Sequence, residues 1–143
     1  MGDLYEDDFL LWSESQATLL RRLAAGERVN DRELDWANLG EEIEAVGRGE
    51  LRAFESLLTQ AIVHRLKQRC WPDSGEVPHW HSGEIRFRQE AADAFSASMR
   101  QRVDLGRINR RAVQRLPATI DGVPPRQVPD LLSVTLDQWL SVD

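Results

Sequence analysis

Apolar residues in the stretch 34–50 recur at the spacing of an α-helix, and this pattern constrains the fold more than any other in the chain. They follow one another at intervals of three and four residues, which places them on one helical face: Trp36, Leu39, Ile43 and Val46. A helix of this kind normally buries its apolar face against another element. The stretch therefore predicts a helix that is packed against further helices.

The same stretch contains a helix start and two glycines. Asp35 is placed to cap the helix N-terminus, because a short carboxylate there accepts hydrogen bonds from the backbone amides of the first turn. Gly40 and Gly47 lie seven residues apart on one flank of the apolar face. Each costs about 1 kcal/mol relative to alanine in a helix interior. We therefore expect a packing or kinking reason for both glycines.

Four polar residues border the apolar faces of this region. Glu42 lies on the same side as Asp35, and His64 and Lys67 are one turn apart in the next apolar run. One interpretation makes the four a polar pocket for acid–base chemistry, with Asp35, Glu42 and His64 as ligands of a divalent metal. The other interpretation makes them a helix cap, a carboxylate paired with arginine and a hydrogen-bonded structural histidine. We favour the second, because charges on helices usually form solvated faces.

One set of residues follows the pattern of a known family: Tyr5, Asp8, Phe9, Trp12, Gln16, Leu34, Asp35, Trp36, Asn38, Leu39, Glu41, Glu42, Ile43, Glu44, Val46, Gly47, Arg48, His64, Lys67 and Trp80. In these residues the chain resembles the domain of unknown function 29, a family of small helical bacterial proteins. The resemblance covers residues 4–88 and is most specific between residues 34 and 48. The resemblance implies an all-helical fold and no established activity. A Cys-Pro-aromatic triplet expected near the C-terminus is replaced by residues 131–134.

Length and composition suit one cytoplasmic domain. The chain has 143 residues, 41 % of them hydrophobic, and a net charge of −6. Residues 1–50 carry thirteen acidic and five basic side chains, a balance of −8, whereas residues 84–116 carry four acidic and eight basic ones, a balance of +4. No apolar run approaches the roughly 20 residues of a membrane span. The single cysteine, Cys70, excludes an internal disulfide and fits a reducing compartment.

The order of turn and helix signals predicts an all-α fold, a bundle of four or five principal helices in a single domain. We expect helices over residues 3–25, over 35–70 as one kinked helix or two, from Ser82 to about residue 103, and near 107–116. Residues 1–116 would form the helical core. Residues 117–143 would form a proline-rich tail, packed on the core or on a partner, that ends in a short helix capped by Thr135 and Gln138.

Two prolines and a glycine predict a loop over residues 71–82, which carries tryptophans. Cys70 and the three histidines could ligate zinc, but no Cys-x-x-Cys or His-x-x-x-His pair supports such a site. We therefore expect a surface loop that is anchored by its tryptophans.

No nucleotide-binding loop, catalytic triad or dinucleotide fingerprint is present in the sequence. Four arginines near residues 107–115 form a basic stripe, but interleaved aromatic residues are missing, so nucleic-acid binding is not favoured. The sequence predicts a non-catalytic protein-binding or scaffold module without a cofactor, whose partner is another protein or a second copy in a homodimer. Three tryptophans would act as exposed anchors, namely Trp71, Trp80 and Trp139. The alternative is a metal-dependent hydrolase that uses the polar pocket.

Overall fold

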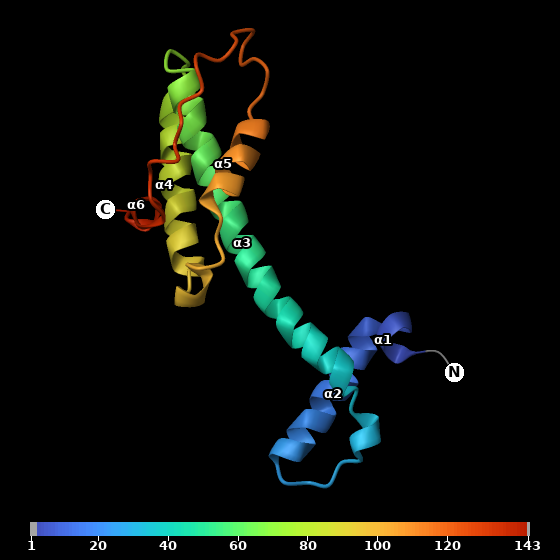
Figure 1. Ribbon diagram of the computed structural model, residues 1–143. Helices are drawn as coiled ribbons and strands as arrows, with labels where there is room; N and C mark the ends of the chain where they lie inside the picture. Colours follow the sequence, from blue (N-terminus) through green and yellow to red (C-terminus); the bar gives the residue numbers. More distant parts are fainter. Residues whose placement is uncertain (1–2, 143) are drawn as a thin grey trace. The chain divides into compact units, whose positions relative to one another are not determined.

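The computed structural model describes residues 3–142 of the chain, and helices account for all the regular elements of that range (Figure 1). The prediction of an all-α fold is confirmed. In chain order, the elements are α1 (Leu4–Asp7), α2 (Phe9–Ala24), α3 (Trp36–Cys70), α4 (Val77–Ala94), α5 (Leu105–Gln114) and α6 (Leu136–Leu140), with short 3₁₀ turns at Asp31–Glu33 and Ala97–Met99.

The chain divides into two compact units, residues 1–48 and residues 49–143. The division falls inside α3 and not between residues 116 and 117, where we placed the boundary between core and tail. Each unit is described by itself below.

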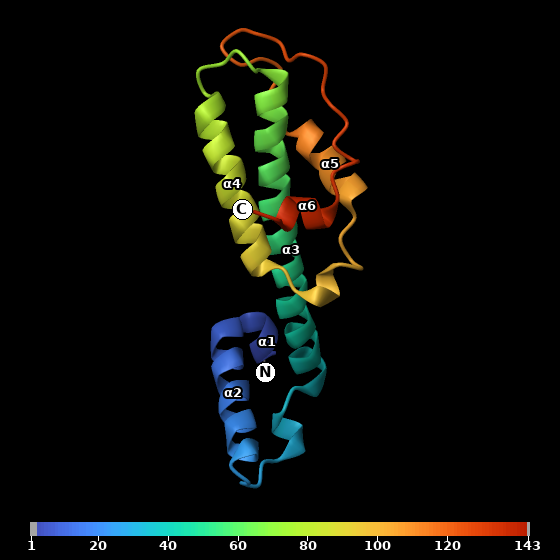
Figure 2. The same ribbon diagram turned by 90° about the vertical axis from the view of Figure 1, so that its left-hand side faces the viewer.

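In the first unit, the expected helix over residues 3–25 is interrupted at Asp8. This residue has a non-helical backbone, and its side chain accepts a hydrogen bond from the amide of Leu11, so it caps α2 and separates it from α1. Helix α2 ends at a Schellman motif in which Gly26 has a φ of +83°. The sequence predicted this stop. Helix α2 then runs antiparallel to the first part of α3 (Figure 2).

Helix α3 is one continuous helix of 35 residues. The glycines at positions 47 and 49 do not divide it. The region that we expected as one kinked helix or two is therefore a single helix. Its buried residues all lie in the second unit, between Phe54 and Cys70. The first half of α3 therefore has no fully buried side chain, whereas the second half contributes many.

The core of the second unit is built on the buried face of α3. Phe54, Leu58, Ile62 and Leu66 follow one another at helical spacing and are almost completely buried. Helix α4 lies alongside this part of α3 and α5 lies beside it as well (Figures 1 and 2). The other buried members of the core are Val63, Ala91, Met99, Ile108, Ala112 and Trp139.

Helix α4 begins at Val77, so the predicted loop over residues 71–82 is too long. Pro78 lies in the first turn of the helix, where a proline is tolerated because its missing N–H would have no intrahelical partner. The loop therefore ends at Glu76. Helix α4 also ends earlier than we expected, at Ala94 instead of near residue 103.

The C-terminal tail returns to the core of its own unit and ends in α6. The side chain of Thr135 accepts a hydrogen bond from the amide of Gln138, and the amide of Thr135 donates to the Gln138 side chain. This is the capping box that the sequence predicted. Trp139 of α6 is completely buried in the core. Among residues 3–142, no helix is long and apolar enough to cross a membrane.

We predict that Trp139→Ala destabilises the second unit by about 3–5 kcal/mol, because it removes a fully buried indole from the core. Urea unfolding followed by circular dichroism would measure the loss. Leu132→Ala is the control, since Leu132 lies in the same tail with an exposed side chain, and its effect should stay within about 0.5 kcal/mol. A loss below about 1 kcal/mol for Trp139→Ala would show that the tail does not hold the core together.

Candidate interaction surface

Asp35 serves as the N-terminal anchor of α3. One of its carboxylate oxygens accepts hydrogen bonds from the indole of Trp12 at 3.0 Å and from the side-chain amide of Asn38 at 2.8 Å. Its backbone amide donates to the side chain of Gln16 at 2.8 Å. These donors lower the pKa of Asp35, with the Asn38 side chain as the largest cause and partial burial as an opposing one. Asp35 thus ties the start of α3 to α2.

Glu42 makes a second tie within the same unit. Its carboxylate accepts a short hydrogen bond from the hydroxyl of Tyr5. This bond, together with partial desolvation and the nearby negative charges, raises the pKa of Tyr5 to about 12. The phenol therefore stays protonated, and continues to donate, to a higher pH than an ordinary tyrosine, whose pKa is 10.0. Glu42 pairs with tyrosine here and not with arginine, which differs from the pairing that we expected for it.

His64 and Lys67 belong to the second unit. The Nδ1 atom of His64 lies 2.8 Å from the carbonyl oxygen of Gln60, and the imidazole packs against Phe87 with ring centroids 5.2 Å apart. A Cβ atom at Gly83 would lie 2.6 Å from the His64 ring, so the glycine permits this packing. The Lys67 ammonium lies 6.0 Å from the centroid of the Trp80 ring. Both residues therefore have structural contacts of their own.

The structure does not assemble the metal pocket that the sequence allowed. Glu42 belongs to the first unit and His64 to the second. Among residues 3–142, no group of three or more His, Cys, Asp and Glu side chains is placed to hold a metal ion. This result also covers the zinc arrangement of Cys70 with His64, His79 and His81. The metal-dependent alternative therefore has no ligand set in the described part of the chain.

Sequence analysis missed a buried ionic network around Glu84. This carboxylate accepts two hydrogen bonds from Arg65, each 3.1 Å long, and further ones from Arg88 and Gln68. Arg88 also donates to the carbonyl groups of Gln138, Trp139 and Ser141, so it holds the end of α6. Glu84 precedes Arg88 by four residues on a helix, and this was the one signal in the sequence.

The three tryptophans proposed as exposed anchors are all buried. Trp139 lies in the main core, and Trp71 and Trp80 form a smaller cluster with Cys70. The expectation that their rings are exposed is therefore wrong. The interface role assigned to them stays a prediction, but in this structure it has no exposed ring to rest on.

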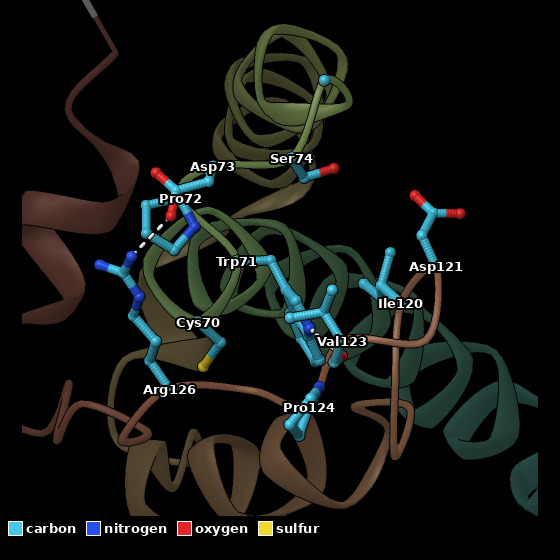
Figure 3. A pocket seen from close by; sticks show the side chains of 11 residues that line it. Cys70, Trp71, Pro72, Asp73, Ser74, Ile120, Asp121, Val123, Pro124 and Arg126 are labelled. Carbon is cyan, nitrogen blue, oxygen red and sulfur yellow. Dashed lines mark hydrogen bonds and ion pairs between the residues drawn. The ribbon is translucent and has the colours of Figure 1, made fainter.

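A small cavity of about 270 Å³ lies where the tail meets the end of α3 (Figure 3). Trp71 forms one wall and donates its indole N–H to the carbonyl of Val123 at 2.8 Å, while Arg126 pairs with Asp73 at 2.6 Å. The Cys70 thiol lines this cavity, and burial raises its pKa. A buried thiol with a raised pKa is a poor nucleophile. These contacts serve mainly to attach the tail.

An apolar stripe on the first half of α3 is the surface that stands out chemically. Trp36 is 54 % exposed, Ile43 70 % and Val46 68 %. The periodicity was predicted correctly, but the prediction that this face is buried is wrong. We call it the α3 stripe and define it by Trp36, Leu39, Gly40, Ile43, Val46 and Gly47.

The two glycines of the α3 stripe have no packing reason within the described chain. A Cβ atom built at Gly40 or at Gly47 would have no neighbouring atom within 4 Å outside the adjacent helix backbone. Replacing either by alanine would meet no obstacle in the described structure and would favour the helix by about 1 kcal/mol. Large apolar side chains and open glycine positions thus occupy the same exposed face.

The fold and this surface define a class of protein: a small all-helical protein that presents an uncovered apolar helix face. The sequence profile of the family described as "Domain of unknown function DUF29" matches residues 4–143. The chain belongs to this family. The match extends well beyond residues 4–88, where the resemblance was recognised from motifs.

A solved structure supports the fold. The chain is similar to an α-helical protein of unknown function from Rhodospirillum rubrum, with 28 % sequence identity and a TM-score of 0.61 over 100 % of this chain and 92 % of the other. A comparison with curated proteins found no match. The family and the solved structure therefore establish the fold, and neither describes an activity.

We predict that Asp35→Ala lowers the free energy of unfolding by about 1–2 kcal/mol at pH 7, because it leaves the Trp12 indole and the Asn38 side-chain amide without their shared acceptor. The pKa of Asp35 is lower in the folded state than its ordinary value of 3.8. Its charged form therefore stabilises the fold above that value, and the contribution is lost as the pH falls through the lowered pKa.

Urea unfolding of both proteins at pH 7 and in the acidic range would measure this contribution. The difference between wild type and Asp35→Ala should shrink in acid. The control Glu44→Ala removes a carboxylate that is 74 % exposed and should show little effect at either pH. A difference that grows in acid would contradict the role assigned to Asp35.

Proposed function

We propose that the chain is a protein-binding helical module and that the α3 stripe is its contact surface. The observation that carries this proposal is the exposure of three large apolar side chains at helical spacing: Trp36, Ile43 and Val46. Soluble proteins rarely leave such a patch uncovered unless it meets a partner. Tryptophan is also among the residues that contribute most to the binding energy of interfaces.

Covering the stripe contributes to binding without being enough for a tight complex. Trp36, Ile43 and Val46 are already partly buried, so burying the rest contributes roughly 3–6 kcal/mol, a fraction of the value for full burial, which is about 1.5–3 kcal/mol for each side chain. Association costs an estimated 4 kcal/mol or more in lost translational and rotational freedom. The stripe alone therefore supports a weak complex, and neighbouring contacts would set its final affinity.

The polar contacts of the first unit favour this proposal over a catalytic role. Asp35 and Glu42, the carboxylates closest to the stripe, are already engaged by donors from α1 and α2. They fix the orientation of the helix that presents the stripe. No observation in the described residues favours the hydrolase alternative, because its proposed ligands are not grouped.

The experiment is photo-crosslinking in intact cells, with a photoreactive amino acid at position 43 or at position 41. Glu41 is the matched control because it lies on the same helix, is also exposed and points to nearly the opposite side. We expect a discrete adduct from position 43 and none above background from position 41. Mass spectrometry would identify the second protein in the adduct.

Binding would then be repeated with both purified components. Ile43→Lys should weaken the complex more than tenfold, and Glu41→Lys should leave it within about twofold, because only Ile43 would be buried in it. The absence of a discrete adduct from position 43, or equal weakening by both substitutions, would contradict the proposal.

A further inference from the structure

The α3 stripe carries more information than its exposure, because its large and small residues alternate. Successive members at intervals of four and three are Trp36, Gly40, Ile43 and Gly47. The large residues occupy one of the two core positions of a heptad, and the glycines occupy the other. A helix that packs on this face must therefore fill the glycine positions and make room for the large side chains.

A second copy of the same stripe meets both requirements in one arrangement. When two helices pack antiparallel, the two core positions of the heptad face each other across the pair. In the register where the facing residue numbers add up to 83, Trp36 faces Gly47 of the second copy and Ile43 faces Gly40. Each contact occurs twice by two-fold symmetry. Large residues then face small ones throughout, which is how packed layers interdigitate.

Other arrangements of the same residues fit less well. A parallel pair would place glycine against glycine in one layer and Trp36 or Ile43 against itself in the next, so it alternates a void with a crowded layer. A different partner protein would have to supply its own large residues opposite the glycines. The second copy needs nothing beyond this sequence.

The flanks of the antiparallel pair are compatible with the same register. On one side, Leu39 lies diagonally across from Val46 of the second copy, offset by about 3 Å along the axis, and would cover a valine that is otherwise 68 % exposed. On the other side, Ala37 lies diagonally across from Glu44 with the same offset. No two like charges face each other at these flanking positions, although residues 1–50 have a charge balance of −8.

From these observations we infer that the α3 stripe is a homodimer contact in which two copies pair antiparallel through Trp36–Gly47 and Ile43–Gly40. The inference rests on the proposed function and names the partner as the chain itself. The paired segment is about 18 Å long, from 12 residues at 1.5 Å each. Such a contact belongs with the smaller specific interfaces, so the dimer dissociates on dilution.

The first test is analytical ultracentrifugation of the purified full chain from roughly 5 to 500 µM, together with acrylamide quenching of its fluorescence. Of the five tryptophans, all within the described residues, Trp36 alone is exposed. We expect dimer formation to increase with concentration and quenching to decrease with it. A protein that stays monomeric at every concentration overturns the inference. This holds whether acrylamide quenches Trp36 or another part of the same chain shields it.

The second test fills the glycine positions. Gly40→Leu with Gly47→Leu should weaken dimerisation at least tenfold while the isolated chain unfolds at a higher urea concentration, because leucine favours a helix more than glycine does and a Cβ atom at either position has no described neighbour within 4 Å. Gly49→Leu is the matched control on another face of the same helix, where a Cβ atom also has no described neighbour within 4 Å. It should raise stability and leave dimerisation unchanged. Equal association by all three proteins would overturn the inference.

The third test measures orientation with spin labels in a Cys70→Ala background. Positions 41 and 48 lie seven residues apart on the same outer face. In the antiparallel register, the two copies of position 41 are offset by about 2 Å along the axis and those of position 48 by about 20 Å. The distance between labels should therefore be clearly longer at position 48. Equal distances would indicate a parallel pair and overturn the inference.

These outcomes separate the two proposals. A monomeric chain that still forms an identified adduct with another protein at position 43 keeps the proposed function and overturns the homodimer. Association with a basic partner would also weaken as salt is added. Self-association of this acidic unit should be maintained or strengthened by salt, because salt screens the repulsion between the two copies.

Discussion

Hydrogen bonds join the first half of α3 to α1 and α2, and they fix the orientation of α3 within the first unit. The Trp12 indole and the Tyr5 hydroxyl donate to Asp35 and Glu42, so the two carboxylates face the helices that cover them. Ile43 lies about 80° and Trp36 about 100° around the helix from Asp35, whereas Val46 lies only about 20° from it, at about 100° per residue. The helix surface that α1 and α2 hold therefore borders the apolar stripe, and Trp36 and Ile43 lie outside it.

The second half of α3 shows the opposite arrangement. There the apolar face is covered from Phe54 onward, and charge is used to attach the last segment of the chain. Glu84 is buried, yet Arg65, Arg88 and Gln68 satisfy its oxygens. A buried carboxylate without these donors would be strongly destabilising. Because Arg88 also binds carbonyl groups at the end of α6, the same network determines where the tail docks.

The sequence predicted local features better than their surroundings. The stop at Gly26 and the capping box at Thr135 depend on residues that are close in the chain, and both are found. The start of α4 was misplaced because Pro78 was taken to end helical structure, although a first-turn proline does not. The network of Glu84 was missed because Arg65 and Glu84 are 19 residues apart and no local pattern joins them.

The error about the α3 stripe has a physical meaning. Periodicity shows which residues share a face, and it does not show whether the described chain supplies anything to cover that face. In most proteins an apolar helix face is also covered by another part of the chain, because local preferences agree with the global fold. Exceptions concentrate at functional sites. Here Gly40 and Gly47 weaken a helix without any close contact in return. Close approach of another helix would offset that cost. The exposed stripe and the open glycines therefore both indicate that another helix packs on this face.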